Sequence, residues 1–302
     1  MRKLTWIITI LILASSLLSA CAGPKPTEAP TQAPPATEVP TQAPPATEAP
    51  TQAPPATEAP TQAPPATEAP KAGLPDLGGK KVTVAVENAY PPFNMIDQNT
   101  NEGVGWDYDA VREICKRINC VPEFKQAAWD GIFPAMQAGE YDMLADGVTI
   151  TDERKKIVDF SIPYVTIGQV LLVRADETAT VDQMKADATK VVGTQLGTTN
   201  EIVAKENFPT ERIKSFEDFG AATLALIAGD IDGVVIDNVS AVGFMNENPG
   251  KLKTIGQLTS NEQLGFAFPP GSELKAPVDA ALTAMQEDGT LEQINKKWGL
   301  VQ

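Results

Sequence analysis

The stretch that decides the fold of this chain runs from residue 190 to residue 236 and reads KVVGTQLGTTNEIVAKENFPTERIKSFEDFGAATLALIAGDIDGVVI. The segment KVVG at 190–193 predicts a buried strand, and the turn at 197–200 leads into a helix expected from about Glu201. A second helix is expected at residues 221–228, and residues 231–236 return as a strand. Strands that alternate with helices in this way are typical of an α/β fold with parallel sheets.

The same alternation continues on both sides of this stretch. Apolar patterns predict strands at residues 81–86, 141–145, 169–174 and 264–268. Asp107 is expected to cap a helix with an apolar stripe at Val111, Ile114 and Ile118, and residues 273–298 are expected to be mostly helical. In α/β folds, ligands bind in the loops that follow the carboxyl ends of the strands. The residues just after the predicted strands are therefore the first candidates for a functional site.

Residues 1–20 have the pattern of a signal peptide. Arg2 and Lys3 precede an apolar run from Leu4 to Leu18, which is too short to be a dependable membrane span. The run ends in LSAC at residues 18–21, which resembles the bacterial lipobox and implies cleavage before Cys21 and lipidation of this cysteine. An ordinary signal peptide with an unrelated cysteine nearby is the alternative. We therefore expect an extracytoplasmic protein anchored by lipidated Cys21, on the outer face of the cytoplasmic membrane or in the periplasm.

Residues 21–72 have a composition of their own. The unit TEAPTQAPPA recurs every ten residues from Thr27, Thr37, Thr47 and Thr57, with Val39 as a departure in the second copy. Because the repeats contain no aromatic residue, they cannot bury a core, and their prolines favour extended polyproline II. We expect a disordered linker that holds the domain away from the membrane; a spacer without tuned length is the alternative. Residues 73–302 remain for a globular part with a core of its own.

Charge and residue usage exclude several classes of function. The chain has 24 Lys and Arg residues against 39 Asp and Glu residues, and its net charge stays negative when residues 1–72 are removed. An acidic surface argues against nucleic acid and anionic lipid as partners. The chain has no histidine, which excludes histidine-dependent catalysis and most zinc sites, and we expect no cofactor and no metal. Cys115 and Cys120, an even pair in an exported domain, are candidates for a disulfide.

Polar and aromatic residues gather in the segments that follow predicted strands. These segments read ENAYPPF at 87–93, WDG at 129–131, DGVTITDER at 146–154, GTT at 197–199 and IDN at 236–238. They supply a guanidinium, amides and hydroxyls for a carboxylate, a carboxylate for an ammonium group, and aromatic faces for a side chain. This set is complementary to a free α-amino acid.

Short motifs along the chain carry a resemblance to a known family. They are YPPF at 90–93, GWD at 105–107, WDG at 129–131, IFPAM at 132–136, GEYD at 139–142, TITDERK at 149–155, VDFS at 158–161, DGT at 288–290 and KWG at 297–299. Each motif is weak alone, but their order and spacing are specific. From about Lys80 to Leu300 the chain closely resembles the amino-acid-binding proteins of ABC importers, the polar amino-acid branch of the type II periplasmic-binding-protein fold. The resemblance implies a protein that captures a free L-amino acid and delivers it to an ABC transporter permease.

The resemblance also implies an α/β fold of two sheet-based lobes joined by two crossover strands. Lobe 1 is expected at residues 73–169 plus 266–302, and lobe 2 at residues 170–265, with crossovers near 169–174 and 263–268. The ligand would be enclosed between the lobes by hinge closure, a population shift driven by contacts made in the closed state. We expect a monomer that meets the membrane only through its lipid anchor.

By position in the family motifs, one group of residues would hold the α-carboxylate of the ligand. Arg154 would clamp it in bidentate geometry, with Thr149 and the backbone around Gly147 beside it. Thr198 and Thr199 would reach it from lobe 2.

Asp237 would bind the α-ammonium group of the ligand. Plain structural alternatives exist for two of these assignments. Arg154 could form a local salt bridge with Asp152 or Glu153, and Asp237 could be an ordinary helix cap. Phe93 is expected to belong to the core rather than to the site.

The remaining site residues would surround the side chain of the ligand. Tyr90 and Trp129 would flank it, and Glu87 and Asp146 would face its far end, with Gln195 nearby from lobe 2. The alternatives are that Trp129 packs within its lobe and that Glu87 and Asp146 point to water. Because unpaired buried carboxylates are costly, these acids favour a cationic ligand: arginine, lysine, ornithine or histidine. Arginine is favoured because its planar guanidinium stacks well. Glutamine or another polar amino acid is the alternative, since an acid also accepts from an amide and Glu87 stands where the family often has Asp.

The segment from Cys115 to Cys120 is similar to the short disulfide segment of histidine- and lysine/arginine/ornithine-binding proteins, with a shorter loop. A bond there requires the helix to end near Asn119, because two cysteines within one helix lie too far apart. A sensor module with the same pocket and a periplasmic enzyme on the same fold remain as alternatives. We expect a binding protein rather than an enzyme, because each carboxylate that can be placed has a binding role.

Overall fold

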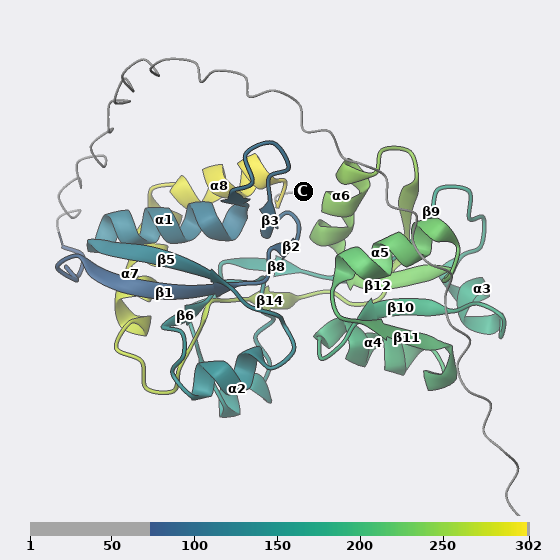
Figure 1. The fold of residues 1–302 in the computed structure, drawn as a ribbon, viewed down its shortest axis with the longest axis horizontal. Helices are drawn as coiled ribbons and strands as arrows, with labels where there is room; N and C mark the ends of the chain where they lie inside the picture. The colour runs from purple at the N-terminus through teal and green to yellow at the C-terminus, as the bar shows by residue number, and fades with distance from the viewer. Residues whose placement is uncertain (1–72, 301–302) are drawn as a thin grey trace, which may run out of the picture. The chain divides into compact units, whose positions relative to one another are not determined.

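The structure of the protein is a computed structural model that describes residues 73–300. Two five-stranded mixed sheets form the centres of two lobes, and the chain passes between the lobes twice (Figure 1). The predicted signal peptide, Cys21 and the repeat linker lie outside the described residues. No helix between residues 73 and 300 combines the length and the apolar character needed to cross a membrane.

The sheet of the first lobe has the strand order β5-β1-β6-β15-β7. Its strands are β1 (Lys80–Val86), β5 (Cys120–Gln126), β6 (Met143–Leu144), β7 (Asp159–Phe160) and β15 (Ala267–Phe268). A small antiparallel sheet beside it contains β2 (Ala89–Tyr90), β3 (Asn94–Ile96) and β4 (Gly103–Val104). The helices of this lobe are α1 (Trp106–Ile118), α2 (Ile132–Gln137), α7 (Lys275–Glu287) and α8 (Thr290–Trp298). The helical stretch expected at residues 273–298 is thus two helices, which are separated at Gly289, where a φ of 77° favours glycine.

The sheet of the second lobe has the strand order β11-β10-β12-β9-β13. Its strands are β9 (Gln169–Arg174), β10 (Val192–Gln195), β11 (Ile213–Phe216), β12 (Gly233–Asp237) and β13 (Leu252–Gln257). Its helices are α3 (Val181–Ala186), α4 (Thr199–Asn207), α5 (Phe219–Ala228) and α6 (Asn238–Glu247). The alternation predicted for residues 190–236 is present as β10, α4, β11, α5 and β12. The expectation of parallel sheets is wrong for β9, which pairs antiparallel with β12 and β13 because it enters the sheet from the other lobe.

Two short antiparallel strands connect the lobes, β8 (Val165–Ile167) and β14 (Glu262–Leu264). The first crossover therefore precedes the predicted segment at 169–174, which is β9 inside the second sheet. The apolar run predicted as one strand at 264–268 is divided between β14 and β15, in two different sheets. Apolar character predicts that such segments are buried but does not predict which sheet they join.

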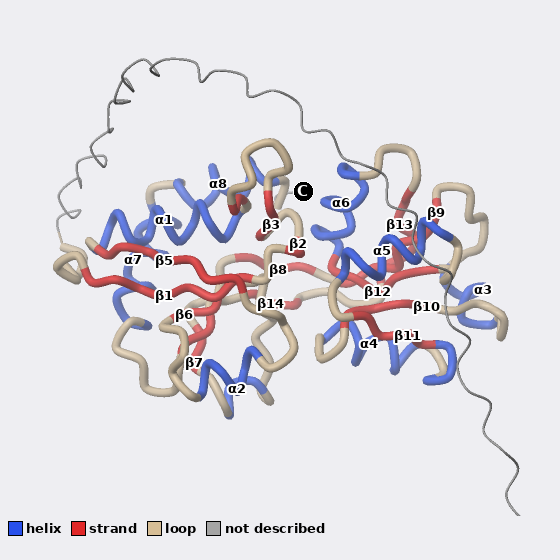
Figure 2. The backbone as a smooth tube through the Cα atoms, in the orientation of Figure 1, coloured by secondary structure: helices blue, strands red, loops and turns tan. Residues whose placement is uncertain are grey.

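Helices flank the sheet of each lobe (Figure 2). Apolar side chains fill the space between each sheet and these helices. In the first lobe, α1 and α8 lie on one side of the strands and α2 lies on the other (Figure 1). Trp106, Phe93 and Phe266 are among the largest side chains that are fully buried. The core thus forms on both faces of each sheet, as alternation of strands and helices predicts.

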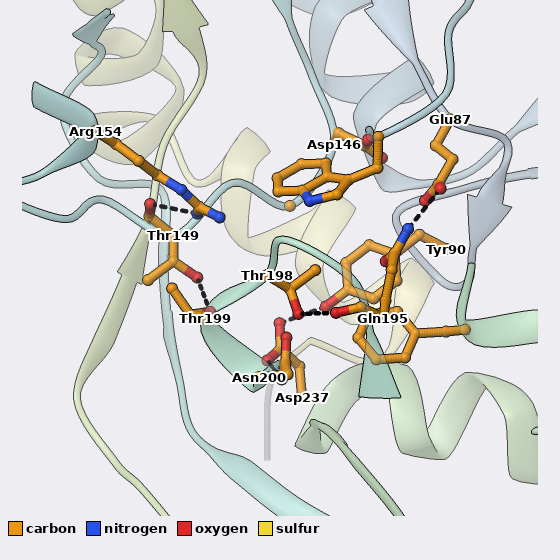
Figure 3. A pocket seen from close by; sticks show the side chains of 13 residues that line it. Glu87, Tyr90, Asp146, Thr149, Arg154, Gln195, Thr198, Thr199, Asn200 and Asp237 are labelled. Carbon is orange, nitrogen blue, oxygen red and sulfur yellow. Dashed lines mark hydrogen bonds between the residues drawn. The ribbon is translucent and has the colours of Figure 1, made fainter. Parts of the chain in front are cut away.

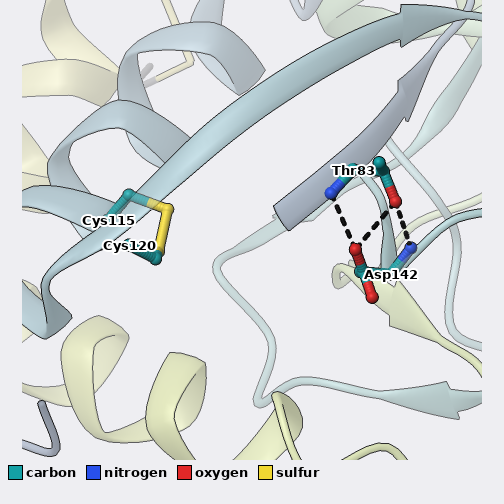
Figure 4. Close-up of a disulfide and its surroundings, with 4 residues drawn as sticks. All are labelled: Thr83, Cys115, Cys120 and Asp142. Carbon is teal, nitrogen blue, oxygen red and sulfur yellow. Dashed lines mark hydrogen bonds between the residues drawn. A yellow bond between two sulfur atoms is a disulfide. The ribbon is translucent and has the colours of Figure 1, made fainter. Parts of the chain in front are cut away.

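The GEYD motif attaches β6 to β1 through Asp142 (Figure 4). The Asp142 carboxylate accepts hydrogen bonds from the backbone N–H and the hydroxyl of Thr83, both at 2.8 Å. The backbone N–H of Asp142 donates to Thr83 Oγ1 at 3.0 Å. These bonds hold β6 parallel to β1, so that Asp146 follows β6 at the same end of the sheet where Glu87 follows β1.

Helix α1 ends at Ile118, because Asn119 adopts a left-handed conformation with a φ of 52°. The chain reverses directly into β5, which brings the Cα atoms of Cys115 and Cys120 to 4.5 Å from each other. The two residues are joined by a disulfide, which ties the end of α1 to the start of β5 (Figure 4).

Candidate ligand-binding site

A pocket lies between the two lobes and is lined by residues of both (Figure 3). It has 13 lining residues. The lining includes every residue predicted to contact the ligand: Glu87, Tyr90, Trp129, Asp146, Gly147, Thr149, Arg154, Gln195, Thr198, Thr199 and Asp237. Asn200 and Phe219 also line the pocket and are additional to the prediction.

The first lobe supplies its part of the pocket from the ends of neighbouring strands. Glu87, Trp129 and Asp146 follow β1, β5 and β6, which are parallel to one another. Because parallel strands end at the same edge of a sheet, these side chains meet there. Gly147 has a φ of 54°, and a Cβ atom on it would lie 2.7 Å from Cε1 of Tyr90. Glycine at this position therefore allows Tyr90 to lie against the turn that follows β6.

The second lobe also supplies pocket residues from the ends of neighbouring parallel strands. Gln195 ends β10 and Asp237 ends β12, which are neighbouring parallel strands. Helix α4 begins beside them with Thr198 as its N-cap, and Thr198 Oγ1 accepts from the backbone N–H of Glu201 at 3.2 Å. A helix N-terminus carries partial positive charge and free N–H groups, so this side of the pocket is suited to an anion.

Arg154 contributes a guanidinium from the start of a short 3-10 helix, Arg154–Lys156, that follows Thr149. Its Nη1 donates to the Thr149 carbonyl oxygen at 2.9 Å, and its Cζ lies 5.1 Å from the centroid of the Trp129 ring. Among residues 73–300 it has no ion-pair partner, and the predicted local alternatives, Asp152 and Glu153, pair with neighbouring lysines instead. Burial lowers the pKa of Arg154 to about 10, so the guanidinium remains charged at neutral pH.

Asp237 is the buried acid of the second lobe. Its carboxylate accepts hydrogen bonds from the Tyr90 hydroxyl and from Asn200 Nδ2, the latter at 2.8 Å. Burial raises the pKa of Asp237 to about 6, against the lowering effect of these two hydrogen bonds. Asp237 does occupy the N-cap position of α6, but its side chain makes no capping hydrogen bond. Its hydrogen bonds go to residues of the pocket.

Glu87 and Asp146 form a pair of buried acids, and Glu87 lies across the pocket from Arg154 in Figure 3. Glu87 Oε1 accepts from Gln195 Nε2, and Asp146 Oδ1 accepts from Asn94 Nδ2, both at 2.6 Å. Burial and the nearby Asp146 raise the pKa of Glu87 to about 9, and burial raises the pKa of Asp146 to about 7. Only 7% of Glu87 and 4% of Asp146 is exposed, so neither acid is directed to open water.

A third acid, Asp107, lies behind this pair. Asn94 Nδ2 donates to Asp107 Oδ2 at 2.9 Å as well as to Asp146, and burial raises the pKa of Asp107 to about 8. The prediction that Asp107 caps α1 is wrong, because the N-cap is Gly105 and Asp107 is buried in the first turn. A Cβ atom on Gly105 would lie 2.1 Å from the Phe93 carbonyl oxygen, so the chain approaches too closely there for a capping side chain.

Phe219 completes the aromatic part of the pocket. It begins α5 after the N-cap Asp218, and its ring stacks on Tyr90 with the ring centroids 5.4 Å apart. Tyr90 also stacks on Phe93, which is fully buried in the core as expected. The helix predicted at residues 221–228 begins earlier, at Phe219, so the sequence pattern does not place this residue at the pocket.

Hydrogen bonds join the lobes directly across the pocket. They pair Tyr90 with Asp237, Glu87 with Gln195, and Thr149 with Thr199. We call this the closed arrangement of the lobes. No group of three or more carboxylate, histidine or cysteine side chains within residues 73–300 is placed to hold a metal ion. The pocket therefore offers a cation, a helix N-terminus, buried acids and aromatic rings to a ligand.

Comparison with known proteins agrees with this architecture. The ABC transporter arginine-binding protein 2 of Escherichia coli (strain K12), a putative assignment, is 32% identical over 223 residues, which cover 72% of this chain and 90% of that protein. A solved ancestral arginine-binding protein bound to glutamine is 38% identical, with a TM-score of 0.67 over 72% of this chain and 97% of that one. The arginine-, lysine-, histidine-binding protein ArtJ from Geobacillus stearothermophilus is 36% identical, with a TM-score of 0.68 over 72% of this chain and 95% of that one.

Other relatives are named as histidine-, glutamine- and cystine-binding proteins, and the ancestral protein has also been solved bound to arginine. The sequence profile described as bacterial extracellular solute-binding proteins, family 3, matches residues 82–301, which include both sheets and both crossing strands. The two-lobed α/β fold, the pocket between the lobes and this match together show that the chain belongs to the bacterial extracellular solute-binding proteins of family 3, which are binding proteins rather than enzymes.

Proposed function

We propose that the protein captures a free L-amino acid, preferably one with a cationic side chain, and delivers it to the permease of an ABC importer. Relatives named for arginine, histidine, glutamine and cystine support an amino-acid ligand. The pocket supports the same class, because it offers a different partner to each charged group of an α-amino acid.

The observation that carries this proposal is the guanidinium of Arg154. It faces the pocket beside the N-terminus of α4, and it has no acidic partner among the described residues. The α-carboxylate of a ligand would accept hydrogen bonds from the guanidinium and from the backbone around Thr198. Asp237 would accept from the α-ammonium group, since a pKa of about 6 leaves its carboxylate ionised at neutral pH.

The acidic end of the pocket favours a cationic ligand. Glu87 and Asp146 are buried, and burial raises the pKa of both because no cation is close enough to offset it. The side chain of arginine, lysine, ornithine or histidine would supply that cation. Tyr90 and Trp129 line the same pocket, and a planar guanidinium is well suited to contact with aromatic rings. Arginine is therefore our first candidate.

Glutamine is the second candidate, and a specific contact favours it. Gln195 Nε2 donates to Glu87 Oε1 at 2.6 Å, so this acid accepts a hydrogen bond from an amide in the structure itself. The amide of a glutamine ligand would make the same kind of bond without needing an ionised carboxylate.

Capture of the ligand would hold the lobes in the closed arrangement. The proposed ligand contacts come from both lobes, with Arg154 on one side and Asp237 on the other. A ligand that binds both sides at once stabilises closure over separation of the lobes, which is the population shift that a transporter could recognise. We further propose that the monomeric domain is held at the membrane by lipidated Cys21 and the linker at residues 21–72. The alternative to uptake is a sensor module that binds the same amino acid and signals its presence.

The proposal is tested by titrating the purified protein with single amino acids by calorimetry, after bound ligand has been removed by unfolding and refolding. Tight binding of L-arginine in the wild type, lost in Arg154→Ala, is the expected result. Lys155→Ala is the matched control, because this neighbour is exposed and pairs only with Asp152. Binding of L-glutamine without L-arginine would keep the amino-acid class and overturn the cationic preference. A wild type that binds none of the twenty common amino acids would overturn the proposal itself.

A further inference from the structure

Helix α6 of the second lobe packs very closely against the loop that follows Tyr90 in the first lobe. Gly243 is buried within α6, and Pro91 comes directly after β2. A Cβ atom on Gly243 would lie 2.8 Å from the Pro91 carbonyl oxygen, 2.9 Å from its carbonyl carbon and 3.0 Å from its Cβ. These distances are shorter than van der Waals contact, and the first two atoms belong to the backbone. Any side chain at position 243 would therefore push the two lobes apart.

Nothing within the helix explains a glycine at this position. Gly243 lies inside the helix Asn238–Glu247 and is not among the glycines with a positive φ. Glycine inside a helix lowers its stability relative to alanine, because the backbone loses more freedom on folding. The reason for the glycine thus lies outside the helix, where Pro91 is the close neighbour.

This contact joins the same two segments that carry pocket residues. Asp237 immediately precedes α6, and Tyr90 immediately precedes Pro91. The Tyr90 hydroxyl donates to Asp237 in the closed arrangement. A movement of the lobes that separates Tyr90 from Asp237 would therefore also separate Pro91 from Gly243.

We infer that Gly243 sets the ligand affinity of the pocket without touching the ligand, because its missing side chain allows the lobes to close. The inference rests on the proposed function, in which the ligand binds to the closed arrangement. A side chain at position 243 fits when the lobes are apart and overlaps Pro91 when they meet. A side chain at position 243 raises the free energy of the closed arrangement alone, so each lobe still folds normally. The protein then binds its ligand more weakly, and this loss of affinity is the measured effect.

The test compares Gly243→Ala with Val242→Ala in the purified protein. Val242 is on the same helix with 46% of its surface exposed, and alanine raises helix propensity there without adding an atom toward Pro91. Gly243→Ala should raise the thermal midpoint of the ligand-free protein by about 2–4 °C. It should weaken L-arginine binding about tenfold or more, and Val242→Ala should leave the affinity within about twofold of the wild type. If the wild type binds only L-glutamine, that amino acid is the probe.

Several results would overturn the inference while the proposed function stands. They are an unchanged affinity in Gly243→Ala, an equal loss of affinity in both variants, or a Gly243→Ala protein that is unfolded by circular dichroism. A wild type that binds neither amino acid would instead contradict the proposed function. That result would overturn the inference as well, because the inference concerns the affinity of this pocket for a ligand.

Discussion

Replacement of Glu87 by glutamine should remove a pH dependence that we expect in L-arginine binding. Burial, with a smaller effect of Asp146, raises the pKa of Glu87 to about 9 in the closed arrangement without a ligand. At pH 7 this carboxyl group is therefore protonated, and its pKa lies about two units above the pH. Because one pKa unit corresponds to about 1.4 kcal/mol, ionising it at pH 7 costs about 3 kcal/mol.

A cationic side chain beside Glu87 would favour the carboxylate and so release its proton. The affinity for L-arginine would then rise with pH by up to about tenfold per pH unit, from the pKa in the complex up to the value of about 9 in the closed, empty pocket. Between pH 6 and pH 8 the gain would be up to about 100-fold. L-Glutamine should show no such rise, because its neutral amide can bind the protonated carboxyl group.

Calorimetry in buffers with different enthalpies of ionisation measures the number of protons released. At pH 7 the wild type should release about one proton per L-arginine bound, and Glu87→Gln should release far less. Asp146→Asn is the companion variant, since the pKa of Asp146 is raised only to about 7 and most of the release should persist without it. If the wild type binds L-arginine equally well at pH 6 and pH 8 and releases no proton, Glu87 does not ionise against the ligand and our reasoning fails.

Three further predictions concern other parts of the structure. Arg154→Lys should weaken L-arginine and L-glutamine equally by about tenfold or more, because an ammonium group cannot hold a carboxylate in bidentate geometry; calorimetry that finds an effect on one ligand alone would place Arg154 at the side chain instead. Burial raises the pKa of Asp107 to about 8, so its contribution to stability is full below about pH 4 and is lost as the pH rises to about 8. As the pH rises from 5 to 8, the free energy of unfolding of Asp107→Asn should therefore increase relative to that of the wild type by up to about 1.4 kcal/mol per pH unit, as measured by urea unfolding. A difference between the two proteins that stays constant with pH would contradict this. Replacing Cys115 and Cys120 by serine should lower the free energy of unfolding by about 2 kcal/mol, as the short closed loop implies, and should leave ligand affinity unchanged.

The pocket residues at strand ends could be predicted from the sequence because their positions depend on local pattern. An apolar run shows where a strand ends, and the fold class places such ends along one edge of a sheet. Glu87 after β1, Asp146 after β6 and Asp237 at the end of β12 all follow this rule. Glu87 and Asp146 share the edge of the first sheet, whereas Asp237 ends a strand of the second sheet. The expectation that all three meet in one pocket comes from the resemblance to a two-lobed family.

The features that escaped prediction depend on partners far along the chain. An aspartate near the start of an amphipathic helix usually caps it, whereas Asp107 is buried because Asn94 donates to it. The apolar run of β9 predicts a buried strand, but only the arrangement of β8 and β14 decides that it belongs wholly to the second sheet. Gly243 carries no signal at all in the sequence, since Pro91 lies next to it only when the two lobes meet.

The two crossing strands give the protein an evolutionary property that its pocket alone would not. The chain leaves the first lobe through β8 and returns through β14, and these strands lie side by side. The intervening segment, residues 168–261, is in effect a cassette whose two ends are adjacent. It carries Gln195, Phe219 and Asp237, whereas Arg154 stays with the host lobe. Recombination at the crossing strands would replace about half of the residues that line the pocket in one event and keep the rest, so the two sides of the pocket can be inherited separately.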